Sequence, residues 1–324
     1  MTPRKAFQLL IIFAIAAVAY FFWHVPEFSS VPDPAKTYVE ATQRFAALEK
    51  SESVLPLRPE GRSRIFTHGC KTDRVFVLLH GLTNCPEQFV PLAQILFASG
   101  ANVILPRSRC AGYADRMNSG QGLQSGQDLI NQAATGLDLA AGLGNRIAVV
   151  GLSGSAVAAA WMAQNRSGID QAALLSPFFS LHGHSVPVID IASNILSAMP
   201  NFYKWWDDAQ KESLAGPSYA YPRYGSVCMA EAVQLSHNVR SHIASRPLRT
   251  TRLDILTTGT DKGANNSLTG ELAASWSLQS PDTVSFYEFP ESAGIPHDMV
   301  DPNQPGANPK LVYSKLLKLL GVVK

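Results

Sequence analysis

The chain opens with a continuous hydrophobic run. Residues 6–23 contain one polar side chain, Gln8, and directly follow Arg4 and Lys5. A helix of that length measures about 27 Å, close to the hydrocarbon thickness of a bilayer. Because basic residues precede the run and none follows it closely, the pattern predicts a membrane anchor with its amino terminus in the cytoplasm and the remaining chain outside. The alternative is a signal peptide cleaved after the small residues at 17–19, which would leave a secreted or periplasmic protein.

A proline-punctuated linker and a helical periodicity come next. Three prolines between residues 26 and 34 prevent the first helix from continuing. Apolar residues then recur at spacings of three and four, which predicts an amphipathic helix of about three turns; they are Tyr38, Ala41, Phe45 and Leu48. We therefore expect an anchor or signal segment at 1–25, and a linker with one amphipathic helix at 26–70.

The pattern changes again after residue 71, where short apolar runs alternate with helix-length segments. The runs lie at 75–79, 101–105, 146–150, 171–175, 251–256 and 283–287. The helical segments lie at about 87–99, 125–143, 154–165, 269–279 and 309–320. Runs of about five apolar residues alternating with helices are typical of buried parallel strands, so the sequence predicts a doubly wound, mostly parallel α/β sheet.

One segment, 181–247, interrupts this alternation. It is rich in aromatic residues and prolines and has no clear strand pattern. We expect a mainly helical cap inserted into an α/β core made of 71–180 and 248–324. Three aromatic residues of this insertion are candidates to line a substrate cleft; they are Trp205, Trp206 and Tyr219.

Composition narrows the function classes. Hydrophobic residues make up 46% of the chain, and the formal net charge is only +2, which gives no electrostatic case for a nucleic-acid partner. The sequence has no zinc-type C-x-x-C pair, H-E-x-x-H motif or phosphate-binding loop, so neither a metal nor a cofactor is expected. The four cysteines permit three disulfide pairings if the domain is exported, and the sequence does not choose among them.

The third apolar run leads into a pattern typical of a nucleophilic serine. Gly151-Leu152-Ser153-Gly154-Ser155 lies between a predicted strand and a predicted helix. This is the G-x-S-x-G strand–turn–helix arrangement with Ser155 in place of the second glycine, and it exposes the Ser153 hydroxyl at a helix amino terminus. The alternative is that Ser153 only caps the following helix.

The first apolar run is followed by His80-Gly81-Leu82-Thr83, a candidate oxyanion loop. Acyl transfer creates a negatively charged oxygen that two preorganised N–H groups can stabilise. We expect these donors to be the amides of Gly154 and Leu82, with Thr83 as the alternative to Leu82. His80 is expected to order the loop and not to act as a base.

A serine nucleophile also needs a base and an orienting carboxylate, in the chain order Ser, acid, His for this strand arrangement. Asp261 follows the run at 251–256, and His297 lies in the loop after the last run. We therefore predict a Ser153–His297–Asp261 triad, with Asp298 as the rival carboxylate.

Together these residues resemble the α/β-hydrolase superfamily, and within it a group of exported esterase-like proteins. The stretch from His80 to Phe89 is similar to that group's HGxTNCPxQF signature, and the loop Pro106–Gly112 is similar to its post-strand loop, with Cys110 where a histidine usually stands. Over roughly residues 36 to 320, the resemblance implies a carboxylic-ester hydrolase or lysophospholipase-like enzyme acting on small-molecule or lipid esters. An acyltransferase that uses the same acyl-enzyme, and a non-catalytic ligand-binding protein of this fold, are the alternatives.

Overall fold

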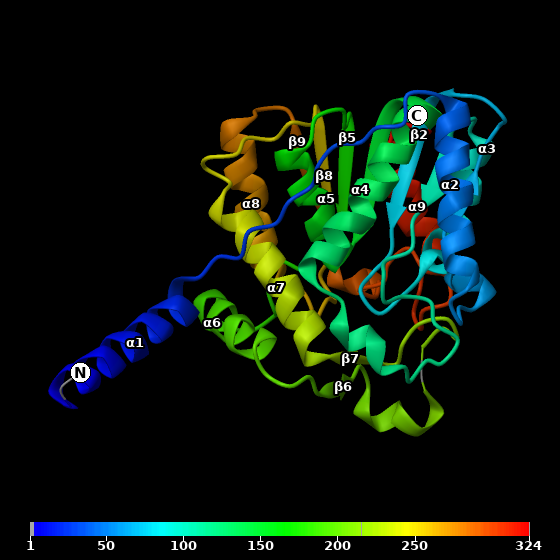
Figure 1. Ribbon diagram of the computed structural model, residues 1–324. Coiled ribbons are helices and arrows are strands. Elements are labelled where there is room, and N and C mark those ends of the chain that lie inside the picture. Colours follow the sequence, from blue (N-terminus) through cyan, green and yellow to red (C-terminus); the bar gives the residue numbers. More distant parts are fainter. Residues whose placement is uncertain (1–2, 215, 324) are drawn as a thin grey trace.

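A seven-stranded sheet forms the centre of the molecule in the computed structural model, which describes residues 3–214 and 216–323. In sheet order the strands are β1 (Arg64–Phe66), β3 (Asn102–Leu105), β2 (Thr72–Leu79), β4 (Gly144–Leu152), β5 (Gln171–Leu175), β8 (Arg252–Thr258) and β9 (Val284–Phe289). All neighbouring pairs are parallel except β1 with β3 (Figure 1). The predicted α/β class and the mostly parallel sheet are confirmed.

Helices cover both faces of this sheet (Figure 1). They are α2 (Tyr38–Ser53), α3 (Val90–Ala98), α4 (Gly126–Leu143), α5 (Gly154–Asn165), α8 (Asn266–Gln279) and α9 (Pro309–Leu319). Alternate residues of β2 point to opposite faces: Val75 and Val77 join the core under α2, α4, α5 and α8, whereas Phe76 and Leu78 join the core under α3 and α9. Burial on both faces explains why the strands are continuous apolar runs in the sequence.

The predicted elements match the observed ones with small corrections. The segment expected as one helix at 87–99 begins as a 3₁₀ turn, Pro86–Phe89, and becomes α-helical only from Val90. The three-residue edge strand β1 was not predicted, because so short a run carries no periodicity.

The insertion 181–247, called the cap segment below, joins β5 to β8. It contains α6 (Val186–Ser197), β6 (Tyr203–Trp205), β7 (Arg223–Gly225) and α7 (Ser226–Ser241). The two short antiparallel strands correct the expectation that this segment contains no strand. Figure 1 shows β6, β7 and α6 at the end of the molecule toward which the central strands run.

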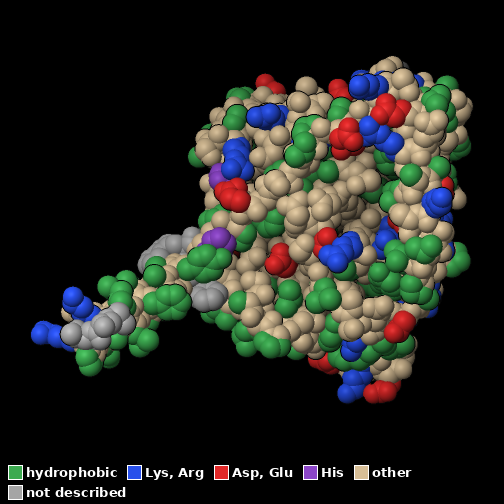
Figure 2. Space-filling model, viewed as in Figure 1, with side chains coloured by type: hydrophobic (Ala, Val, Ile, Leu, Met, Phe, Trp, Pro, Cys, Tyr) green, Lys and Arg blue, Asp and Glu red, His purple; other side chains and the backbone are tan. Residues whose placement is uncertain are grey.

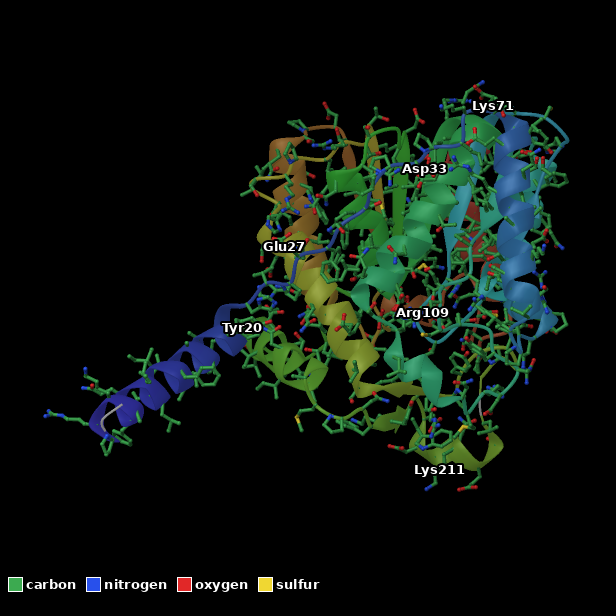
Figure 3. The ribbon with its side chains drawn as sticks, in the orientation of Figure 1. Tyr20, Glu27, Asp33, Lys71, Arg109 and Lys211 are labelled. Carbon is green, nitrogen blue, oxygen red and sulfur yellow. The ribbon has the colours of Figure 1, made fainter. Side chains whose placement is uncertain are left out.

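The amino-terminal helix α1 (Pro3–Trp23) projects from the body of the molecule (Figure 1). Its residues 3–20 are long and apolar enough to cross a membrane, although a signal sequence meets the same test. The linker that follows has no regular secondary structure and runs along the body past Glu27 and Asp33 (Figure 3). Hydrogen bonds from Asn238 to the Pro26 carbonyl (2.7 Å) and from Ala35 to the Asp138 carbonyl (2.8 Å) fix it there.

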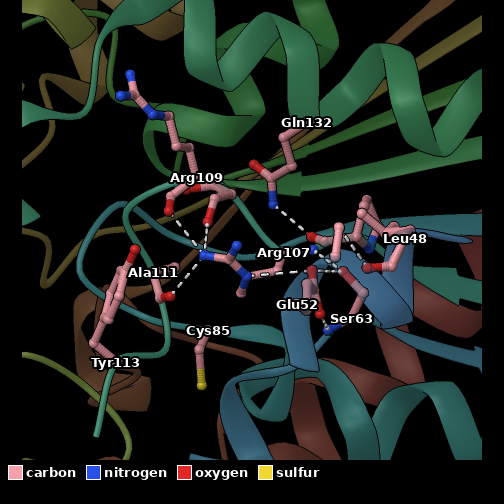
Figure 4. A network of polar contacts seen from close by, with 12 residues as sticks. Leu48, Glu52, Ser63, Cys85, Arg107, Arg109, Ala111, Tyr113 and Gln132 are labelled. Atoms are coloured by element: carbon pink, nitrogen blue, oxygen red, sulfur yellow. Dashed lines mark hydrogen bonds and ion pairs between the residues drawn. The ribbon is translucent and has the colours of Figure 1, made fainter. Parts of the chain in front are cut away.

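A buried ionic network joins α2 to the core (Figure 4). Arg107, in the loop after β3, pairs with Glu52 of α2 (3.2 Å), and Ser63 donates to the same carboxylate (2.6 Å). The Arg107 guanidinium also donates to the carbonyls of Ser108, Arg109 and Ala111. The network therefore shapes the loop 106–112, which in turn contacts the candidate site.

Candidate active site

The three residues of the predicted triad lie beyond the carboxyl ends of parallel strands in one half of the sheet. Ser153 directly follows β4, Asp261 follows β8, and His297 follows β9, in a sheet whose order there is β4-β5-β8-β9. Ligand and catalytic sites of open parallel sheets form at this edge.

The turn at Ser153 is strained. Ser153 has φ 58° and ψ −121°, a conformation that residues with a side chain rarely adopt. Its amide donates to the Leu175 carbonyl (2.9 Å), and its own carbonyl accepts from Ala156 (3.1 Å) and Phe178 (3.2 Å). These bonds hold the strained backbone between β4 and α5. The Ser153 side chain makes no capping hydrogen bond to α5, so the conformation is not that of a simple helix cap.

Small residues beside Ser153 are required by close packing. A Cβ atom built on Gly151 would lie 2.5 Å from the Ser155 carbonyl oxygen, and one on Gly154 would lie 2.8 Å from Leu82 Cγ. Ser155 itself is fully buried, and its hydroxyl donates to the His80 carbonyl at 2.6 Å. Serine at this position therefore ties helix α5, which follows the Ser153 turn, to the loop 80–83, a role that the sequence pattern did not reveal.

Asp261 and His297 form a hydrogen-bonded pair. His297 Nδ1 donates to Asp261 Oδ2 at 2.6 Å, while Asp261 Oδ1 accepts from the amides of Gly263 (2.8 Å) and Ala264 (3.0 Å). Burial alone would raise the pKa of Asp261, but the hydrogen bond and charge of His297 and the two amides lower it below its ordinary value. Burial alone would lower the pKa of His297, but the hydrogen bond and charge of Asp261 outweigh it and raise that pKa above its ordinary value.

The rival carboxylate, Asp298, points elsewhere. It accepts from Gln304 Nε2 at 2.6 Å, and burial raises its pKa. The loop that carries His297 is fixed at Ile295, whose carbonyl accepts hydrogen bonds from Thr258 (2.9 Å) and Thr260. The structure thus pairs His297 with the distant Asp261 and leaves its sequence neighbour Asp298 on another partner.

The candidate oxyanion loop, residues 80–83, lies between the Ser153 turn and the loop that carries His297. The Leu82 side chain lies over Gly154, while a Cβ built on Gly81 would lie 3.8 Å from the Leu152 side chain and 3.9 Å from Asp298 Oδ1. The neighbours of Ser153 and of His297 therefore meet at this loop. Among residues 3–214 and 216–323 the Ser153 hydroxyl makes no hydrogen bond, to His297 or to another group, so the hydrogen-bonded part of the predicted triad is His297 with Asp261. The Gly154 amide is at the first position of α5, where helical N–H groups have no intrahelical acceptor.

His80 is buried inside this loop and is ordered by two backbone groups. Its Nε2 accepts from the Ser108 amide (3.2 Å), so Nδ1 carries the proton and donates to the Gly81 carbonyl (2.9 Å). Burial lowers the pKa of His80 to about 4. Gln88 adds a further support that the sequence did not suggest, because its Oε1 accepts from the Gly81 amide at 2.9 Å. The sequence feature that could have indicated this role of Gln88 is its place in the HGxTNCPxQF stretch.

The three cap residues singled out in the sequence occupy different environments. Trp206 is 53% exposed and donates from Nε1 to the Thr83 hydroxyl at 3.0 Å, which places it at the edge of the candidate oxyanion loop. Trp205 lies in β6 opposite Arg223. Tyr219 is buried and donates to Asp301 Oδ1 at 2.7 Å, so its contacts are those of a packing residue.

A cavity adjoins Asp261. A hollow of about 480 Å³ opens beside Asp261, between the 182–184 loop and Glu288, and Ser153 is not among its lining residues.

All four cysteines are unpaired, with Cys70 exposed and Cys85, Cys110 and Cys228 buried. Over the described part of the chain, no group of three or more His, Cys, Asp or Glu side chains is arranged to hold a metal ion.

Comparison with known proteins supports the fold assignment. No protein-family model matches the chain, and no curated protein matches it. Solved structures do: one belongs to the metagenome-derived lipolytic enzymes LipS and LipT (TM-score 0.60, 13% identity, covering 82% of this chain and 99% of that one). Two others are monoglyceride lipase from Saccharomyces cerevisiae (0.60, 14%, 80% and 91%) and monoacylglycerol lipase from Paleococcus ferrophilus (0.60, 14%, 81% and 98%). The chain therefore has the α/β-hydrolase fold that these enzymes share.

Proposed function

We propose that the protein is a serine hydrolase of carboxylic esters. The observation that carries the proposal is the strained Ser153 turn at the same sheet edge as a hydrogen-bonded Asp261–His297 pair. A purely structural serine has no need of a φ of 58° at a helix amino terminus, nor of a buried carboxylate that holds one tautomer of a histidine at the same sheet edge.

In the proposed reaction, His297 Nε2 accepts the Ser153 proton as Ser153 Oγ attacks the ester carbonyl carbon. The negative charge that forms on the carbonyl oxygen is stabilised by the amides of Gly154 and Leu82, with the Thr83 amide as the alternative. The bond to the alcohol oxygen then breaks, and His297 returns the proton to the departing alcohol. Water, deprotonated by His297, attacks the acyl carbon; the bond to Ser153 Oγ then breaks, and His297 returns the proton to Ser153 Oγ, which releases the carboxylic acid and restores the free enzyme. Throughout, Asp261 keeps the proton of His297 on Nδ1 and stabilises the imidazolium.

Lipid-derived esters are the substrate class that we favour. Apolar side chains surround the site on the cap side, where Phe178, Ile189 and Val233 pack against Leu82. Two of the similar structures are lipases described as acting on monoglycerides. Trp206 at the rim of the oxyanion loop is the cap residue best placed to contact an acyl chain.

We further propose that residues 6–23 of α1 anchor the enzyme, with the α/β core (71–180 and 248–324) and the cap segment outside the cytoplasm. The support is an apolar helix that projects from the body and is followed by a linker bound to the core. The segment 26–70 then acts as the connection, fixed by α2 through Glu52.

The test is the Ser153→Ala variant assayed on p-nitrophenyl esters, together with labelling of the wild type by a fluorophosphonate probe. We expect labelling at Ser153 and a loss of turnover of at least a thousandfold with an unchanged circular dichroism spectrum. Ser99→Ala, at an exposed helix end outside the site, is the control and should keep full activity. Turnover within tenfold of wild type in folded Ser153→Ala would refute the proposal.

A further inference from the structure

Helix α6 of the cap segment buries three polar side chains beside one apolar side chain, Ile189. Asp190, Ser193 and Asn194 are each less than 9% exposed and face α7. Arg240 of α7 pairs with Asp190, and Gln234 of α7 donates to Asn194 Oδ1 (3.1 Å). The one charged side chain of the helix is thus neutralised inside the protein.

The opposite side of α6 is apolar and open. Its outer face consists of Val188, Ile191 and Ile195, continued by Met199 just beyond the helix end. At 3.6 residues per turn these four positions fall within about 80° of the helix circumference. Val188 is 60% exposed, Ile195 43% and Met199 50%, and Ile191 is half-buried. A helix that faces water normally has the reverse arrangement, with apolar side chains on the buried side.

This outer face adjoins the helix that can cross a membrane. The carboxyl end of α1 contacts α6. There Asn194 of α6 donates to the His24 carbonyl at 3.1 Å, and Tyr20 stacks on His24 with ring centroids 4.2 Å apart. Asn238 of α7 holds the next part of the linker at Pro26. In Figure 2, hydrophobic side chains cover α1, with Lys and Arg only near its free end, and continue onto the edge of the body where Figure 1 shows α6. A bilayer spanned by α1 would therefore have its surface beside α6.

We propose that the outer face of α6 docks into the surface of the same bilayer that α1 spans. At twelve residues α6 is too short to cross a membrane, but its length and apolar stripe suit a helix that lies in the interface plane, about 5–10 Å deep in the lipid surface. Phe202, 53% exposed and following Met199 in the chain, extends the apolar surface toward β6. Polar anchoring of the inner face to α7 explains how an inverted helix stays folded before it meets lipid.

The docked helix would bring lipid close to the candidate active site. Ile189, on the inner side of α6, belongs to the apolar cluster that packs against Leu82 of the oxyanion loop. The site thus lies about one helix diameter, roughly 10 Å, from the proposed lipid surface. This consequence rests on the proposed hydrolase activity, whereas the docking itself rests only on the proposed membrane anchor α1.

The docking is tested by label depth in the full chain, reconstituted in phosphatidylcholine nanodiscs. A bimane label is placed at Val188→Cys in a Cys70→Ser background, because the other three cysteines are buried. The matched control carries Leu278→Cys on α8, which is 85% exposed. All variants are also made with Ser153→Ala, so that the result is independent of any hydrolysis.

We expect brominated acyl chains to quench the Val188 label at least twofold more than the Leu278 label, and aqueous iodide to show the opposite order. Equal quenching of the two labels would overturn the proposal. A Val188 label shielded from both quenchers would also overturn it, since the face would then be covered by a second copy of the chain or another protein.

A functional measurement separates docking from chemistry. Val188→Glu with Ile195→Glu should reduce turnover of a long-chain ester embedded in vesicles by about tenfold, because two exposed apolar side chains that would enter the lipid are lost. Turnover of soluble p-nitrophenyl acetate should not change, and Leu278→Glu should change neither. If the double variant changes turnover of both esters by the same factor relative to the wild type, docking is contradicted. If the wild type turns over neither ester, the hydrolase proposal is refuted, and the quenching result alone decides the docking.

Discussion

Replacing Asp261 with asparagine tests the geometry of the candidate triad most directly. The Asp261 side chain is inaccessible to solvent, and its Oδ1 is fixed by the amides of Gly263 and Ala264. An asparagine would keep its oxygen on those two amides and turn its NH₂ group toward His297 Nδ1. The imidazole would then have to accept at Nδ1 and carry its proton on Nε2, where it cannot take the Ser153 proton.

The expected magnitude follows from the wrong tautomer. The equivalent change in a serine-protease triad lowers kcat about 10⁴-fold, and at 1.36 kcal/mol per tenfold this is about 5.5 kcal/mol of transition-state stabilisation. The pH dependence should also move. Because the charge of Asp261 raises the pKa of His297, its removal lowers that pKa, and the acid limb of kcat/KM shifts to lower pH.

The assay measures kcat and kcat/KM on a p-nitrophenyl ester from pH 5 to 9, with thermal unfolding as the check on folding. Asp298→Asn is the matched control, because that carboxylate accepts from Gln304 and not from the His297 nitrogen that Asp261 binds. We expect Asp298→Asn to cost less than tenfold. A folded Asp261→Asn variant within tenfold of wild type, or an Asp298→Asn variant equally impaired, would refute the assignment of Asp261.

Three further predictions concern the supports of the site. Ser155→Ala removes the donor to the buried His80 carbonyl and should destabilise folding by about 1–3 kcal/mol, measured by urea denaturation; no change would show that the carbonyl finds another donor. Glu52→Ala leaves the Arg107 guanidinium buried without its carboxylate and should cost about 3–5 kcal/mol in the same measurement, whereas a cost below 1 kcal/mol would contradict the buried pair. His80, with its pKa lowered to about 4, binds fewer protons when folded than when unfolded, so stability should fall as pH drops from 6.5 toward 4, by on the order of 3 kcal/mol. The His80→Gln variant should lose that dependence, and an unchanged pH–stability curve would argue against a buried neutral imidazole.

Local sequence patterns predicted the structure best where a pattern fits only one kind of element. The apolar runs of β2 and β4 had to be buried strands, since five consecutive apolar residues between turn signals satisfy both faces of a covered sheet. Likewise, Gly151 and Gly154 around Ser153 indicated a tight strand-to-helix turn, and the structure shows the positive φ that such a turn demands. The long apolar run at 6–23 predicted an anchor or signal helix, and the structure has there a helix, α1, that is long and apolar enough to cross a membrane and projects from the body.

Other features depend on residues far apart in the chain, and no local pattern contains them. Asp298 is next to His297 in the sequence, yet the loop fixed at Ile295 aims the imidazole at Asp261, 36 positions away. The hydroxyl of Ser155 acquires its role only because the strand order β2-β4 brings the His80 carbonyl to it.

In helix α6, the local sequence determines one feature and the tertiary contacts determine another. The spacing of Val188, Ile191 and Ile195 determines that one side of the helix is apolar, and periodicity alone would assign that side to the core. The tertiary structure decides otherwise, because Arg240 and Gln234 of α7 satisfy the polar side and turn the apolar side outward. A sequence pattern fixes which residues share a face of a helix, while the direction of that face is set by the partners that the fold places beside it.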